Sequence, residues 1–178
     1  IRNGYEYQDK KGKPKVDLLK AGIRQTITEI RKGIETIQKL GFHHFAIGTM
    51  PELGGIIRNP KGGAMASDET LYLATKLHNQ ALHAMLDELT TKANDFQLIT
   101  YQAFEINQKT ADNPQAYGFT KLDAPCYAGS VTGEFYGKKE FCKDPMGYKF
   151  WEYLHPNTKM QCYYAAQFLS DIASGKLI

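Results

Sequence analysis

The sequence has no apolar run close to the roughly 20 residues that a membrane-spanning helix needs, and its 178 residues carry a formal net charge of only +3. So small a charge does not indicate nucleic-acid binding. Neither a C-x-x-C pair nor a G-x-x-x-x-G-K loop occurs, so no metal or nucleotide cofactor is expected. The chain has ordinary globular composition, with 42% hydrophobic and 23% charged residues. Its length fits one domain or a large piece of one.

Cysteine is scarce, with residues only at positions 126, 142 and 162, which allows one disulfide and one remaining thiol. Cys126 and Cys142 flank a segment rich in glycine, lysine and aromatic residues, which is typical of a closed surface loop. A disulfide between them would indicate maturation in an oxidising compartment. No signal peptide is visible, but the sequence begins at Ile1 without a methionine, so we expect the true N-terminus to lie upstream.

Hydrophobic periodicity predicts a first helix followed by a strand. Asp17 can cap this helix, and Leu40 and Gly41 can end it. Its apolar stripe recurs at steps of four and three residues and consists of Ile23, Ile27, Ile30, Ile34 and Ile37. A strand is then expected over residues 43–48.

The same order of helix and strand recurs in the second half of the chain. Ser67 can cap a helix that runs to about Lys92, and a strand is expected over 96–101. A short helix should end near Asn107, and residues 113–145 look irregular. Pro156 suits the first turn of a last helix, whose predicted inner side comprises Ala165, Ala166, Leu169 and Ile172.

Two strands separated by long amphipathic helices predict a parallel sheet with helices on both faces. Two strands cannot form such a sheet alone. Three further parallel strands, upstream in the same protein or in a partner chain, would complete a three-layer α/β/α fold. The alternative is a self-sufficient domain.

Four of the five histidines have a structural explanation. His43 and His44 point to opposite faces of the predicted strand, and His78 and His83 miss the i, i+4 spacing of a zinc-binding helix. His155 differs because it follows Glu152 by three residues and precedes a proline.

A turn at this point would bring the carboxylate of Glu152 to the imidazole of His155. A carboxylate that accepts the Nδ1 proton fixes the tautomer and leaves Nε2 free to take a proton from a hydroxyl nucleophile. The same spacing also fits an ion pair at the start of a helix.

The segment Trp151-Glu152-x-x-His155-Pro156 resembles the F-W-D-x-x-H-P motif that closes the GDSL, or SGNH, family of lipases and esterases. Other segments resemble family motifs in the expected order: 41–45 (G-A-R-x-F), 50–54 (L-P-P-L-G), 77–82 (a central helix), 113–119 (N-P-x-x-Y-G-F) and 142–145. The chain looks most similar to the secreted bacterial branch of phospholipases, lysophospholipases and acyltransferases.

This resemblance implies a flavodoxin-like three-layer α/β/α fold, with residues 1–178 as the C-terminal portion of a single SGNH-hydrolase domain. The family's N-terminal strands and its G-D-S serine would lie outside the chain, because no G-D-S occurs in it. Arg2-Asn3-Gly4-Tyr5 resembles the family's G-N-D-Y segment, so Asn3 is a candidate oxyanion donor, with an ordinary turn asparagine as the alternative. Gly4 and Glu152 both stand where the family has aspartate.

The resemblance implies a serine ester hydrolase that acts on phospholipid or lysophospholipid acyl esters through an acyl-enzyme, with acyl transfer to another alcohol as an additional activity. His155 would be the general base, Glu152 would orient it and Asn3 would help to hold the oxyanion. The alternative is a catalytically inactive relative that binds lipid or a protein. No cofactor is implied.

The expected partners are a lipid or ester substrate, the N-terminal segment that carries the serine, and a membrane surface, but no nucleic acid. By resemblance the protein is secreted or periplasmic in a bacterium. The loop between Cys126 and Cys142 would lie near the mouth of the active site as a lid or membrane contact. The alternative is that its disulfide only stabilises a surface loop.

Overall fold

The protein is described here from a computed structural model, which places residues 4–55, 66–92, 96–128 and 141–174 of the chain. Its α-helices are α1 (Val16–Lys39), α2 (Asp68–Lys92), α3 (Ala103–Asp112) and α4 (Thr158–Ala173). Its strands are β1 (His44–Gly48), β2 (Gln97–Tyr101), β3 (Lys121–Pro125) and β4 (Tyr148–Phe150). Short 3-10 helices are η1 (Gly4–Tyr7), η2 (Pro114–Tyr117) and η3 (Pro145–Gly147).

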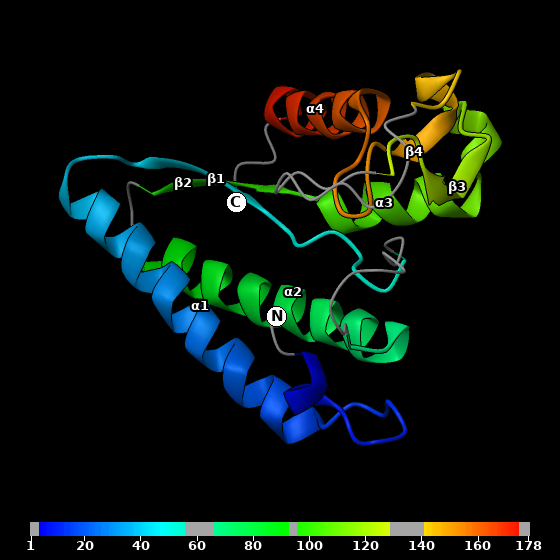
Figure 1. Ribbon diagram of the computed structural model, residues 1–178. Coiled ribbons are helices and arrows are strands. Elements are labelled where there is room, and N and C mark those ends of the chain that lie inside the picture. The colour runs from blue at the N-terminus through cyan, green and yellow to red at the C-terminus, as the bar shows by residue number, and fades with distance from the viewer. Residues whose placement is uncertain (1–3, 56–65, 93–95, 129–140, 175–178) are drawn as a thin grey trace.

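The predicted order of helix and strand is confirmed around one pair of parallel strands. β1 pairs with β2 from His44 opposite Gln97 to Gly48 opposite Tyr101. In Figure 1, α1 and α2 lie on one side of this pair and α4 lies on the other. Parallel strands are normally covered by helices on both faces. The α/β fold class expected from the sequence is therefore confirmed.

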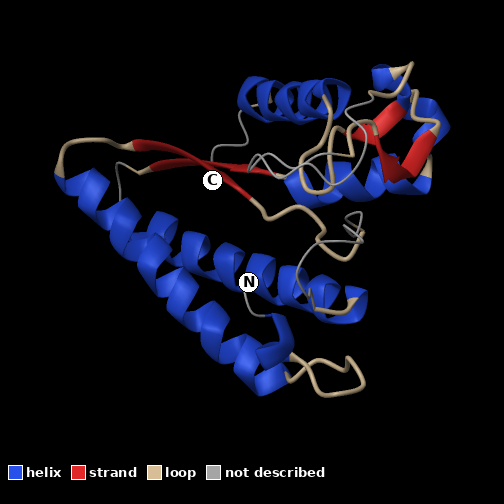
Figure 2. Cartoon of the chain, in the orientation of Figure 1, coloured by secondary structure: helices blue, strands red, loops and turns tan. Residues whose placement is uncertain are grey.

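A second parallel pair, between β3 and β4, was not predicted. Lys121 lies opposite Tyr148 and Pro125 lies opposite Phe150, with a register shift between them. Figure 2 shows this short pair beside α3 and apart from β1 and β2. The sequence predicted neither strand, because β4 has three residues and β3 ends in a proline, so neither shows clear alternation.

A hydrophobic core joins α1 and α2 to the β1–β2 pair. Its buried residues are Ile27, Ile34, Leu82, Met85, Leu86, Leu89, Phe96 and Leu98. Ile23 and Ile30 pack against this core and are partly buried, so most of the predicted isoleucine stripe is confirmed. Ile37 is exposed instead, because a spacing of 3.5 residues drifts about 20° per heptad around a straight helix.

The predicted cap of α2 is confirmed and that of α1 is wrong. The Ser67 hydroxyl accepts the Thr70 N–H at 3.2 Å and donates to the Gly12 carbonyl at 2.5 Å. Asp17 lies inside the first turn of α1 and makes no cap there. A carboxylate in this turn still favours the helix through its interaction with the helix dipole.

The start of α4 differs from the prediction by two residues. The helix begins at Thr158, so Pro156 lies before its first turn, and Asn157 caps it by accepting the Met160 N–H at 2.9 Å. Pro156 instead forms an isolated bridge with Phe150. Asparagine is among the most favourable N-cap residues, so this signal was present in the sequence.

The predicted inner side of α4 is also wrong. Its four members, Ala165, Ala166, Leu169 and Ile172, are exposed. The helix packs on β2 through Tyr164 and Phe168, whose rings meet the ring of Tyr101 edge-on at centroid distances of 6.0 and 6.1 Å. Aromatic contacts with one strand therefore set the rotation of α4, rather than its small and aliphatic residues.

The unpaired edge of β1 and the exposed face of α4 predict that the isolated chain associates with itself. Within the described residues β1 pairs with β2 alone, and Leu169 and Ile172 are 63% and 43% exposed. An unpaired strand edge beside exposed apolar side chains favours association. We expect residues 1–178, produced alone, to self-associate in light scattering. Replacing Leu169 and Ile172 by lysine should reduce the scattering, whereas Gln25→Lys on α1 should not. A monomer that unfolds cooperatively would contradict this expectation.

Candidate active site

β4 leads into a closed turn formed by residues 151–156, which is called the 151–156 turn below. The Trp151 N–H donates to the His155 carbonyl at 2.9 Å, so the turn closes on itself. The Asn157 N–H then donates to the Lys149 carbonyl at 2.9 Å. The chain therefore returns alongside β4 before α4 begins, and the position of the turn is set by the strand.

The turn brings Glu152 and His155 into contact, as the sequence predicted. Glu152 is only 2% exposed, and its Oε1 accepts the backbone N–H of His155 at 2.7 Å and contacts Nδ1 of the same residue. The imidazole is 58% exposed. A carboxylate at Nδ1 favours the tautomer with its proton on that nitrogen, which leaves the Nε2 lone pair free. This arrangement can take a proton from a hydroxyl group.

A disulfide bond within the chain lies beside the 151–156 turn. It joins Cys126 to Cys142, as expected. The Cys126 N–H donates to the Phe150 carbonyl at 3.1 Å, and the Tyr127 N–H donates to the Trp151 carbonyl at 2.7 Å. A bridge of this span stabilises a fold by about 3 kcal/mol in the loop-entropy account. The expected lid or membrane contact falls on residues 129–140, which lie outside the described residues.

Three aromatic side chains, Tyr127, Phe141 and Trp151, form an aromatic cluster next to the turn. Their ring centroids are 5.2 to 5.9 Å apart and their planes are nearly parallel. Phe141 is 60% exposed and Trp151 is 37% exposed. Trp151 is therefore not enclosed in the core, and its ring stacks on side chains at the two ends of the disulfide-closed loop.

Lys149 lies buried in β4, and its ammonium group is held by α3. Its Nζ donates to the carbonyl and the Oδ1 of Asn107 at 3.1 and 3.0 Å. The Asn107 amide in turn donates to the Tyr164 hydroxyl of α4 at 3.1 Å. Burial lowers the pKa of Lys149 to about 8, and the negative charges of Glu52 and Asp112 oppose this decrease. This network ties β4, and with it the 151–156 turn, to two helices.

Two other predicted features have different outcomes. Asn3 lies outside the described residues, so its role as an oxyanion donor stays a prediction. Cys162 is a free thiol, as expected, and it is exposed on α4.

No cluster of side chains in the described part of the chain has the composition of a metal site. No helix among the described residues has the length and hydropathy of a membrane span.

Comparison with known proteins identifies the family. The profile of the GDSL-like lipase/acylhydrolase family matches residues 11–168. The chain belongs to this family. The GDSL relatives include an Arabidopsis thaliana protein named inactive GDSL esterase/lipase-like protein 25, which is 28% identical over 76% of this chain and 33% of its own length. Two GDSL esterase/lipases of the same plant are each 23% identical, over 80% and 83% of this chain and 40% of their own lengths.

This GDSL chain therefore spans about a third to two fifths of the length of these three relatives. These relatives are plant proteins, and the bacterial phospholipase branch expected from the sequence stays a prediction.

Sequence reasoning missed Lys149 and Asn157, although both lie next to the GDSL closing motif. Lys149 stands between two aromatic residues in Tyr148-Lys149-Phe150, a pattern typical of a buried strand with one polar member. Recognition of this strand would have placed the Lys149 side chain opposite its neighbours. Its partner Asn107 could not be inferred, because that contact joins residues 42 positions apart.

The lowered pKa of Lys149 predicts a pH-dependent stability. Its ordinary pKa is 10.5 and its pKa in the fold is about 8. Between these values the unfolded chain binds more protons, so the free energy of unfolding should rise with pH. In chemical denaturation of the full-length protein, Lys149→Met should remove this rise, and Lys109→Met, at an exposed position of α3, should keep it. An unchanged pH dependence in Lys149→Met would contradict the assignment.

Proposed function

We propose that the full-length protein is a serine ester hydrolase in which His155 is the general base and Glu152 orients it. One observation carries the proposal: a buried carboxylate holds Nδ1 of an exposed imidazole, within the motif that the GDSL family places at its active site. The printed family description, lipase/acylhydrolase, supports an acyl ester as the substrate.

Glu152 and His155 together can serve both the formation and the breakdown of an acyl-enzyme. The serine Oγ attacks the ester carbonyl carbon while Nε2 of His155 takes the hydroxyl proton, and a tetrahedral oxyanion forms. Glu152 stabilises the resulting imidazolium, and Asn3 would donate to the oxyanion. Collapse breaks the ester C–O bond, and His155 gives its proton to the leaving alcohol. Water then releases the acid from the acyl-enzyme, or a second alcohol takes the acyl group.

The serine is proposed to lie in an N-terminal segment of the same protein, with residues 1–178 as the C-terminal portion of one SGNH-hydrolase domain. The 178 residues contain no G-D-S. The hydroxyl of Ser67 is occupied by the cap of α2. The greater length of the relatives supports this arrangement.

Phospholipid or lysophospholipid is the proposed substrate class, and the aromatic cluster is the proposed contact with a lipid surface. Phe141, Trp151 and the nearby Leu154 are exposed beside His155. Tryptophan and tyrosine favour the boundary between lipid and water, because their rings are apolar and carry one polar group. The disulfide between Cys126 and Cys142 supports a secreted or periplasmic location.

A catalytically inactive lipid- or protein-binding protein is the second candidate. One curated relative is named inactive, and Glu152 stands where the family motif has aspartate. Assays of the unmutated full-length protein separate the two candidates. Turnover of a short-chain ester favours the enzyme, and lipid binding without turnover of any ester favours the binding protein.

His155→Ala in the full-length protein should lower kcat/KM on a short-chain ester by roughly 10⁴-fold or more. The fold should persist, because the backbone N–H of residue 155 still donates to Glu152. Glu152→Ala should lower kcat/KM by a smaller factor, since the imidazole remains. His83→Ala, at a half-buried position of α2 remote in sequence from the turn, is the control and should be neutral for kcat/KM. Turnover like that of the wild type in His155→Ala would overturn the assignment.

The aromatic cluster gives a separate prediction. Phe141→Ser should lower hydrolysis of lysophospholipid in vesicles about tenfold and change the hydrolysis of a soluble short-chain ester little, because only the vesicle requires the surface contact. Phe42→Ser is a matched control, since Phe42 is also 60% exposed but lies between α1 and β1. Equal loss on both substrates in Phe141→Ser would refute a lipid-contacting role.

A further inference from the structure

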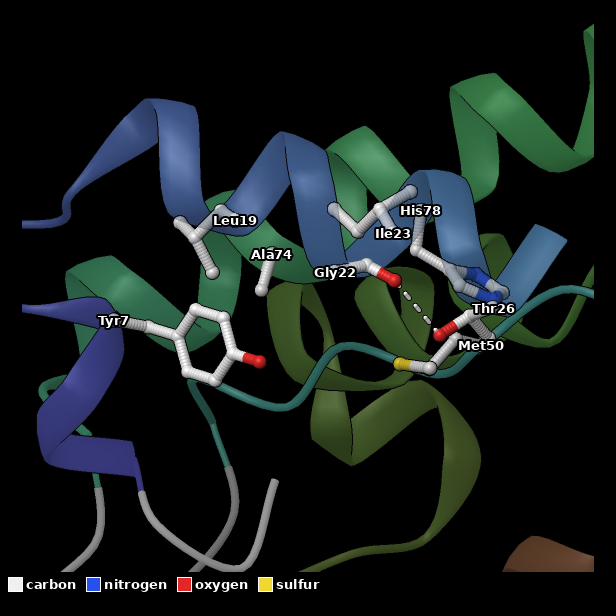
Figure 3. A pocket seen from close by; sticks show the side chains of 8 residues that line it. All are labelled: Tyr7, Leu19, Gly22, Ile23, Thr26, Met50, Ala74 and His78. Atoms are coloured by element: carbon white, nitrogen blue, oxygen red, sulfur yellow. Dashed lines mark hydrogen bonds between the residues drawn. The ribbon is translucent and has the colours of Figure 1, made fainter. Parts of the chain in front are cut away.

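A pocket of about 370 Å³ lies between α1, α2 and the loop that follows β1. It is lined by Tyr7, Leu19, Gly22, Ile23, Thr26, Met50, Ala74 and His78, as Figure 3 shows. Leu19 and Ala74 form its buried apolar wall, and Ile23 and Met50 are half-buried beside them. A volume of this size lies in the lower part of the range of roughly 300 to 1,000 Å³ that is typical of small-ligand sites.

Polar bonds fix the walls of this pocket in place. The Asn79 side chain accepts the Met50 N–H at 2.8 Å and donates to the Met50 carbonyl at 2.9 Å, so the loop after β1 is fastened to α2. The Thr26 hydroxyl donates to the Gly22 carbonyl at 3.1 Å within α1. A Cβ at Gly22 would lie 3.2 Å from the Tyr7 hydroxyl, so the absence of a side chain there lets the Tyr7 ring pack closely. The pocket is therefore preformed.

The pocket borders the loop that leaves the carboxyl end of β1. Met50 follows the carboxyl end of β1 by two residues, and ligands of open α/β sheets bind at this edge. Two residues further along, the charge of Glu52 acts on Lys149 in β4. Lys149 in turn precedes the 151–156 turn. At the other end of the pocket, Tyr7 follows the predicted oxyanion donor Asn3 by four residues in sequence.

We propose that this pocket binds the acyl chain of the ester substrate, an inference that rests on the proposed ester hydrolase function. Leu19 and Ala74 in its inner wall offer a ligand no side-chain hydrogen-bonding group, which suits a hydrocarbon chain. Its polar side chains, Tyr7, Thr26 and His78, are few, as in sites that bind an apolar ligand with one polar end. The small volume selects medium-length chains, of the order of ten carbons, over long ones.

Direct binding of a fatty acid tests the pocket without any need for catalysis. Calorimetry with sodium decanoate and the full-length protein should detect binding, and Ala74→Phe should weaken it at least tenfold by filling the pocket. Ala84→Phe is the matched control, because it places the same ring at an exposed position of α2. Undetectable decanoate binding, or equal binding by Ala74→Phe and the wild type, would overturn the proposal.

Chain-length selectivity tests the role of the pocket in turnover. The ratio of kcat/KM for a decanoyl ester to that for an acetyl ester should fall about tenfold or more in Ala74→Phe. In Ile23→Ala, which enlarges the pocket at a small cost in packing, the preferred chain should lengthen by one or more carbons. A ratio unchanged in both variants would overturn the proposal.

The two assays also separate the pocket from the proposed function. Decanoate binding that Ala74→Phe weakens, in a protein that turns over no ester, would support the pocket and contradict the hydrolase. Ester turnover without decanoate binding would support the hydrolase and contradict the pocket. Ester turnover without decanoate binding is also the result expected if another segment of the full-length protein occupies the pocket.

Discussion

Glu152 is a carboxylate almost fully removed from water, and such a group needs hydrogen-bond donors close by. Among the described residues, the two donors that contact it come from one residue, through the backbone N–H and Nδ1 of His155. This requirement closes the 151–156 turn, sets the orientation of the imidazole and leaves Nε2 on the exposed side. The side chain of glutamate is one methylene longer than the aspartate of the family motif, and the turn accommodates it.

The turn is carried by a strand of only three residues, so sheet hydrogen bonding alone gives it little support. Side-chain hydrogen bonds and a disulfide hold this short strand in place. Lys149 anchors the strand to α3 through Asn107, and the disulfide between Cys126 and Cys142 holds the chain on its other side. A buried lysine is costly unless it is hydrogen-bonded. Its presence next to the proposed catalytic pair is consistent with a need for rigidity there.

Local and periodic features of the fold could be predicted from the sequence, and features set by distant contacts could not. The isoleucine stripe of α1 and the Ser67 cap of α2 depend on neighbouring residues; the cap was correct, and the stripe was correct except at Ile37. The rotation of α4 depends on Tyr101, more than 60 positions before Tyr164, and it was predicted wrongly. The contact between Glu152 and His155 spans three residues, which is why a motif sufficed to find it. Asn107 as the partner of Lys149 required the folded chain.

The central claim is that Glu152 fixes the tautomer of His155 so that Nε2 can act as a base. Nitrogen NMR of the full-length protein labelled at histidine measures this tautomer directly. Above the imidazole pKa, the account predicts a protonated Nδ1 and an unprotonated Nε2 for His155, and loss of this preference in Glu152→Ala. A proton on Nε2 in the neutral ring, or a tautomer ratio that Glu152→Ala does not change, would contradict it.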